Sequence, residues 1–121
     1  MAEYPGSTSR DYTTKISNSG LGTPADDPKV EISPVAGEHI CIQRIDFSSA
    51  SDGAHTLTIK EDTAASATFD QLKWALQITK DGPGAISGGD APIYVGTKGR
   101  GIEVKLTTEG GTTGNVNVLY Y

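Results

Sequence analysis

Apolar and polar residues alternate with a period of two along most of the chain after residue 28, which predicts β-strands with one face buried and one face in water. The alternation predicts seven or eight short strands with turn-forming glycine, proline and aspartate between them. Their ranges are Thr13–Ser17, Lys29–Ser33, His39–Ser48, His55–Glu61, Leu72–Thr79, Pro92–Gly96, Ile102–Thr108 and Asn115–Tyr121. Short strands at regular spacing predict an all-β protein, an antiparallel β-sandwich or small barrel.

The same alternation predicts which side chains face the core. On each predicted strand, apolar residues two positions apart share a face, and we expect that face to point into the core. The inward positions are Val30, Ile32, Leu57, Ile59, Leu72, Trp74, Leu76, Ile78, Ile102, Val104, Leu106, Val116, Val118 and Tyr120.

One strand breaks the alternation. Within His39–Ser48, Ile40 and Ile42 share one face, whereas Ile45 and Phe47 share the other. A shift of one residue moves every following side chain to the opposite face. The sequence therefore predicts a β-bulge or corner near Gln43–Arg44.

Two connections are long. Asp62–Phe69 is small and polar and is expected to hold one helical turn, and the glycine-rich segment Lys80–Asp90 is expected to be a loop.

Residues 1–28 differ from the rest of the chain, because they hold three of the six prolines and few apolar residues. Such a composition cannot build a core of its own. It is typical of a frayed terminus or of an extended arm that becomes ordered against a neighbouring subunit. We expect the arm, with Tyr4, Tyr12 and Ile16 as its partner-binding residues, because tyrosines are frequent interface anchors. The predicted domains are thus an arm over 1–28 and a β-sandwich over 29–121.

The last strand carries apolar residues on both faces. Leu119 and Tyr121 lie opposite the face of Val116 and Val118, so they would be exposed on a single sandwich. We expect a subunit contact to cover these two side chains.

Charge and cysteine content exclude several classes of protein. Lys and Arg number 10 against 15 Asp and Glu, a net charge of −5, which disfavours nucleic acid and anionic membranes as partners. No apolar run approaches the ~18 residues of a membrane span, and the N-terminus lacks the pattern of a signal peptide. The lone Cys41 cannot form an intramolecular disulfide, which suits a reducing compartment.

Candidate metal ligands are few and scattered. His39 and Cys41 share a strand face, and zinc would accept them together with His55 and Asp46, but nothing in the sequence brings His55 to that face. Loop aspartates are typical of calcium ligands or of turns, and no Asp-x-Asp-x-Asp-Gly run is present. These aspartates are Asp26, Asp27, Asp52, Asp81 and Asp90. We expect no metal and no other cofactor.

No arrangement predicts catalysis. Glu61, Asp62 and Asp70 would serve glycoside hydrolysis only across a sugar-binding cleft, which a chain of 121 residues can hardly wall. Cys41 lies mid-strand among isoleucines, where a thiol is inert, and the glycine-rich loops lack the spacing of phosphate-binding motifs. We expect the protein not to be an enzyme.

Aromatic residues offer a further alternative. Trp74, Tyr94, Tyr120 and Tyr121 could form a platform on which a sugar ring stacks, as in a carbohydrate-binding module. Against this, Trp74 shares its face with predicted core residues, and the tyrosines would serve equally well in strands or in an interface.

The region from His39 to Tyr121 resembles the small β-sandwich proteins of tailed bacteriophage particles, such as capsid decoration (cement) proteins. The resemblance is carried by the segments HICIQRIDF at His39–Phe47, HTLTI at His55–Ile59 and GNVNVLYY at Gly114–Tyr121. It implies a jelly-roll-like or immunoglobulin-like sandwich and no catalytic activity.

The resemblance also implies where such a protein acts. It would be made in the host cytoplasm and would bind the major capsid protein on the outer surface of the virion, as a homo-oligomer, most simply a homotrimer. The alternatives are a carbohydrate-binding module and a structural protein associated with the tail or a fibre.

Overall fold

The computed structural model of the protein describes residues 13–19, 28–49, 55–62, 68–78, 82–108 and 114–121. These residues form nine strands and no helix, and so no helix that could cross a membrane. The strands are β1 (Thr13–Ser19), β2 (Lys29–Ile32), β3 (Cys41–Ser49), β4 (His55–Asp62), β5 (Phe69–Ile78), β6 (Gly82–Ser87), β7 (Tyr94–Val95), β8 (Ile102–Thr108) and β9 (Gly114–Tyr120).

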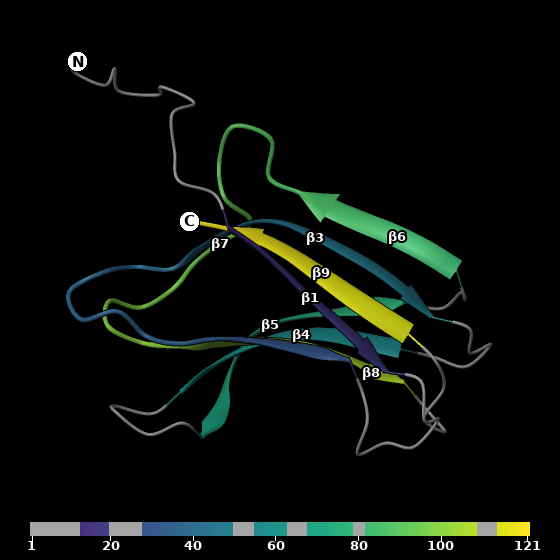
Figure 1. Ribbon diagram of the computed structural model, residues 1–121, viewed down its shortest axis with the longest axis horizontal. Coiled ribbons are helices and arrows are strands. Elements are labelled where there is room, and N and C mark those ends of the chain that lie inside the picture. Colours follow the sequence, from purple (N-terminus) through teal and green to yellow (C-terminus); the bar gives the residue numbers. More distant parts are fainter. Residues whose placement is uncertain (1–12, 20–27, 50–54, 63–67, 79–81, 109–113) are drawn as a thin grey trace.

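The strands form two antiparallel sheets that pack face to face as a β-sandwich, which confirms the predicted all-β class (Figure 1). Sheet A has the order β1-β9-β3-β6, and the short strand β7 also pairs with β3. Sheet B has the order β2-β8-β4-β5. The strand predicted over Thr13–Ser17 is therefore part of sheet A, although it lies within the predicted arm.

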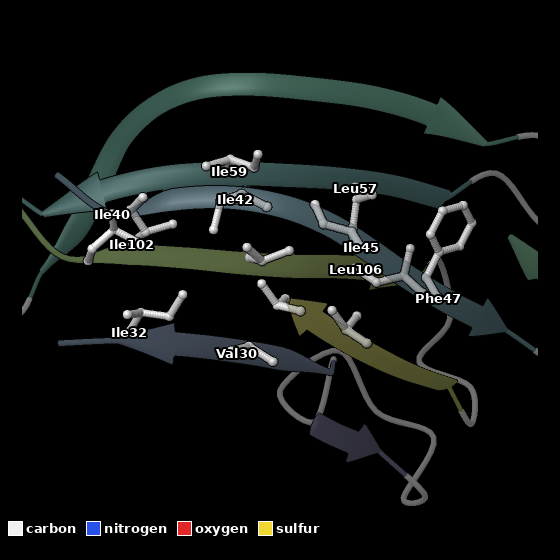
Figure 2. Close-up of a cluster of buried hydrophobic side chains, with 13 residues drawn as sticks. Val30, Ile32, Ile40, Ile42, Ile45, Phe47, Leu57, Ile59, Ile102 and Leu106 are labelled. Atoms are coloured by element: carbon white, nitrogen blue, oxygen red, sulfur yellow. The ribbon is translucent and has the colours of Figure 1, made fainter. Parts of the chain in front are cut away.

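The core lies between the two sheets and contains a cluster of buried apolar side chains (Figure 2). It is contributed almost entirely by β-branched residues and leucine, which suit a pleated surface. Its members are Val30, Ile32, Ile40, Ile42, Ile45, Phe47, Leu57, Ile59, Ile102, Val104, Leu106, Val116 and Val118. All inward positions predicted on β2, β4 and β8 are buried, as are Val116 and Val118 of β9.

The predicted β-bulge is confirmed in β3. Ile42 pairs with Tyr120 of β9, but the next pair is Arg44 with Leu119, so Gln43 is an extra residue in β3. The extra residue reverses the alternation. As a result, Ile42 on one side of the bulge and Ile45 on the other both face the core.

The expected core positions on β5 are partly wrong. Trp74 and Ile78 pack against the core, but Leu72 is 57% exposed and Leu76 is 38% exposed. The register explains Leu72: Trp74 pairs with Ile59 and Leu72 with Lys60, so Lys73 is an extra residue that turns Leu72 to the outer face. Leu76 pairs with Leu57 on the core face and is exposed because β5 is the edge strand of sheet B.

The loop expected over Lys80–Asp90 is also wrong in large part, because residues 82–87 form β6, which pairs with β3. Glycine and proline disguise this strand in the sequence. Pro83 is tolerated because β6 is an edge strand, and Gly84 lies against the ring of Phe47, where there is no space for a side chain. Ile86 of β6 pairs with Ile45 and packs against the core. The helical turn expected over Asp62–Phe69 falls largely outside the described residues.

Two connections extend together from one end of the sandwich. Residues 33–40, between β2 and β3, and residues 96–101, between β7 and β8, lie side by side on the left of Figure 1. The backbone nitrogen of Gly99 donates a 2.8 Å hydrogen bond to the carbonyl oxygen of Glu38. Gly37 and Gly99 form the tips of the two turns with φ of 77° and 75°, a conformation that disfavours other residues.

The contact between Gly84 and Phe47 predicts that a larger residue at position 84 destabilises the protein. A Cβ atom at residue 84 would lie 2.5 Å from Cε2 of Phe47 and closer still to Cζ, so Gly84→Ala forces the ring to move within the core. We expect a loss of about 1–3 kcal/mol in the free energy of unfolding, measured by urea denaturation.

Ala85→Val is the matched control, because Ala85 is exposed on the same strand, and it should change stability by less than about 0.5 kcal/mol. In a Phe47→Leu background the cost of Gly84→Ala should shrink, because the clashing ring is gone. An equal cost in both backgrounds would contradict this account of the site.

Candidate functional site

The main cluster of buried polar side chains among the described residues lies at the end of β4. Glu61 shares the inward face of β4 with Leu57 and Ile59, and it pairs with Ile102 of β8. It is only 2% exposed. A carboxylate is therefore buried at the end of the apolar core, where an ionised group needs hydrogen-bond donors.

Donors from the opposite sheet satisfy Glu61. The hydroxyl of Tyr94, in β7 of sheet A, donates a hydrogen bond to Oε2 of Glu61, and the backbone nitrogen of Thr97 donates to the same oxygen at 2.9 Å. Tyr94 itself packs against the core. The cluster thus connects β4 of sheet B to β7 of sheet A and to the turn that follows it.

These contacts shift the pKa values of both partners. Burial acts to raise the pKa of Glu61, but the hydrogen bonds from Tyr94 and Thr97, together with the positive charge of Lys73, outweigh it and hold that pKa below its ordinary value of 4.5. Burial, the hydrogen bond to Glu61 and the negative charge of Glu61 raise the pKa of Tyr94. Glu61 is therefore an ionised acceptor and Tyr94 a neutral donor at neutral pH.

Asp62 extends the cluster at the same end of β4. The Asp62 backbone nitrogen donates to the carbonyl oxygen of Gly101 at 3.2 Å, and Nη1 of Arg100 donates to the Asp62 carbonyl oxygen at 3.1 Å. The Asp62 side chain is buried beside Gly101, where an added Cβ would lie 3.0 Å from Oδ2. The turn at 97–101 is thereby attached to the end of β4.

The contacts that the structure gives this cluster join β4 to β7 and to the turn at 97–101. Oε2 of Glu61 accepts from both of its donors, and Asp70, the third carboxylate of the predicted set, is exposed on β5. What the arrangement does is hold the two sheets together at one end of the core.

The residues considered as metal ligands are not brought together. His39 is exposed, with Nδ1 2.8 Å from the carbonyl oxygen of Gly96, whereas His55 is buried at the start of β4 in the other sheet. Asp46 forms an ion pair with Arg44 at 2.9 Å. Within the described part of the chain, no group of three His, Cys, Asp or Glu side chains could hold a metal ion.

Most of the aspartates considered for calcium fall outside the described residues, namely Asp26, Asp27, Asp52 and Asp81. Asp90 is described and lies exposed in the turn after β6.

The aromatic residues are divided between the two faces of their sheets. Trp74, Tyr94 and Tyr120 pack against the core from β5, β7 and β9. Tyr121 follows Tyr120 and is half-buried, with its backbone nitrogen donating to the carbonyl oxygen of Cys41 at 3.0 Å. The described aromatic side chains therefore do not gather as one stacking platform.

The predicted partner-binding residues lie on sheet A or outside the described residues. Leu119 alternates with the buried Val118, and it pairs with the exposed Arg44 on the outer face of the sheet. Leu119 and Tyr121 are both half-buried, and their spacing of two places them together. Ile16 lies in β1 and its backbone pairs with Asn117, whereas Tyr4 and Tyr12 fall outside the described residues.

The pairing of Glu61 with Tyr94 was not predicted, although the sequence contains half of the signal. The alternation over His55–Glu61 puts Glu61 on the same face as Leu57 and Ile59, which marks it as buried. Its partner comes from a strand 33 residues later, and no local pattern indicates that pairing.

No family model and no curated protein matches the chain.

The buried carboxylate predicts a loss of stability in acid. Folding lowers the pKa of Glu61, so the unfolded chain binds a proton at this residue more readily than the folded chain. The contribution of Glu61 to the free energy of unfolding is therefore present above about pH 4.5 and is lost as the pH falls through the lowered pKa. Glu61→Gln should remove this part of the fall in the free energy of unfolding between neutral pH and about pH 3.

Tyr94→Phe tests the donor. It should lower the free energy of unfolding at neutral pH by about 1–3 kcal/mol, because a buried carboxylate loses a hydrogen bond. Asp70→Asn, at an exposed carboxylate, is the control and should leave the acid dependence close to that of the wild type. An unchanged acid dependence in Glu61→Gln would show that Glu61 is not the group responsible.

Proposed function

We propose that the protein is a non-enzymatic structural protein of a virion, a decoration protein that binds the outer surface of a capsid and stabilises the shell. Its partner would be the major capsid protein. It would act as a homo-oligomer, and we propose a trimer because the resemblance to phage decoration proteins implies one.

The strand order supports a jelly roll, one of the two kinds of sandwich that the resemblance implies. Consecutive strands alternate between the two sheets except at β4–β5 in sheet B and β6–β7 in sheet A, and the orders β1-β9-β3-β6 and β2-β8-β4-β5 form two four-stranded paths. With β7 taken as an addition beside β3, this order supports the proposal of a double-sheet jelly roll. Jelly rolls occur in viral capsid proteins and in lectins.

The distribution of side chains is the observation that carries the proposal. The buried carboxylate of Glu61 is engaged inside the fold, whereas large apolar side chains lie at the surface on both sheets and in the connections. The exposed ones are Val35, Leu72, Leu76 and Val95. Large apolar side chains exposed at several places on the surface are suited to contacts with other proteins.

A carbohydrate-binding module is favoured less. That function needs aromatic rings together at the surface, and Trp74, Tyr94 and Tyr120 pack against the core instead.

The outer face of sheet A provides the test. Leu119→Lys introduces a charge where we propose a subunit or capsid contact, and it should weaken co-sedimentation with capsids that lack the protein by about tenfold or more. Thr107→Lys, at an exposed position of β8 in the other sheet, is the matched control and should bind as the wild type does. Equal binding by both variants, with unfolding curves that show both to be folded, would contradict the proposed contact.

Deletion of residues 1–12 tests the arm. The deletion ends before β1, so that sheet A keeps all of its strands. We expect the truncated protein to lose capsid binding or its oligomeric state, measured by co-sedimentation and by light scattering. Full retention of both would contradict a role for the arm.

A further inference from the structure

We propose that two copies of the chain pair through β5, with Trp74–Ile78 of one copy antiparallel to Trp74–Ile78 of the other and Leu76 on the two-fold axis. The contact would join the two B sheets into one continuous sheet.

β5 has a free edge. β5 is the last strand of sheet B, and no described strand pairs with its outer side. An edge strand of this kind presents unpaired backbone N–H and C=O groups that accept a further strand.

The first half of this edge is protected. Lys73 and Asp70 are extra residues where the register with β4 shifts, between Ile59 and Lys60 and again between Glu61 and Asp62. Bulges and charged side chains are the usual means by which proteins prevent edge pairing. Pairing is therefore confined to the regular half of the strand, residues 74–78.

The second half has no such protection. Residues 74–78 have the sequence WALQI, which contains no charge, and they pair with β4 without a register shift. The other edges differ: β2 is four residues long and carries Lys29 and Glu31, β6 contains Pro83, and β7 has only two residues. Among the edges whose side chains are described, the second half of β5 is thus the one open to a partner strand.

A second copy is the occupant that the side chains fit. In a two-fold antiparallel register about Leu76, Trp74 faces Ile78 of the other copy, Ala75 faces Gln77, and Leu76 faces itself. Trp74, Leu76 and Ile78 share the core face of sheet B, so each apolar residue meets an apolar residue and the two cores become continuous.

Charge permits self-pairing at this place. The chain carries a net charge of −5, so two copies repel one another, and a contact through uncharged residues adds no like-charge pairs to that repulsion. Residues 74–78 provide that surface. The 38% exposure of Leu76, on the core face, would be removed by the partner's strand.

Leu76→Lys tests the pairing in the full-length purified protein. It places like charges opposite one another on the two-fold axis. At each concentration of a dilution series at which the wild type is paired, the mass of the variant measured by light scattering should be half that of the wild type. Leu72→Lys is the matched control, because Leu72 lies on the same strand but on the outer face of the protected half, and it should leave the mass unchanged.

Charge reversal keeps the test independent of folding. An equimolar mixture of Leu76→Lys and Leu76→Glu should regain the mass of the wild type, because opposite charges then meet at the axis. A wild-type mass of one chain at every concentration, a mass unaffected by Leu76→Lys, or no recovery in the mixture would each overturn the proposal.

The two-fold contact is separate from the proposed capsid function and needs no capsid for its test. It also leaves the outer face of sheet A available. If a trimer forms elsewhere, the β5 contact would pair two trimers, and Leu76→Lys would still halve the mass.

Discussion

The extra residue in β3 is the constraint on which the rest of the sandwich depends. β3 is the strand with the most partners: β9 lies along one side, and the other side is shared between β7, which pairs with Cys41 and Ile42, and β6, which pairs with Arg44–Ser49. Gln43 lies between these two sets of partners. Without the extra residue, the apolar side chains of one half of β3 would face water.

The bulge also organises the turn by which the chain passes from β6 to β7. The carbonyl oxygen of Gln43 accepts a 3.1 Å hydrogen bond from the backbone nitrogen of Gly88, and Nε2 of Gln43 donates to the carbonyl oxygen of Gly89. The carbonyl oxygen and the side-chain Nε2 of Gln43 thus hold residues 88 and 89. This in turn places β7, and with it the hydroxyl of Tyr94, opposite Glu61.

The sequence predicts those features of a strand that depend on the order of its own residues, and it misses those that depend on contacts with other strands. The bulge in β3 was predictable because its inward residues, Ile42 and Ile45, are separated by an odd number of positions. The shift at Lys73 was not, because Leu72, Trp74 and Leu76 alternate without a break. β6 was missed because Gly84 is required by the ring of Phe47, a contact with another strand that no pattern in the loop reveals.

The candidate site divides in the same way. The burial of Glu61 follows from the period of β4, but its partner Tyr94 depends on the path of the chain between β6 and β7, which only the three-dimensional structure gives. The outward position of Leu119 followed from the period of β9. Local alternation therefore predicts which face a side chain occupies, and strand pairing decides what it meets there.

The exposed leucines of β5 show why this distinction matters for function. Leu72 is more exposed than Leu76, but a bulge has turned it to the outer face, away from the core. Leu76 is less exposed but continuous with the core through Leu57. An apolar side chain at the open edge of a core is the feature that another strand can complete, so position within the sheet, more than exposed area, distinguishes a binding surface from an incidental one.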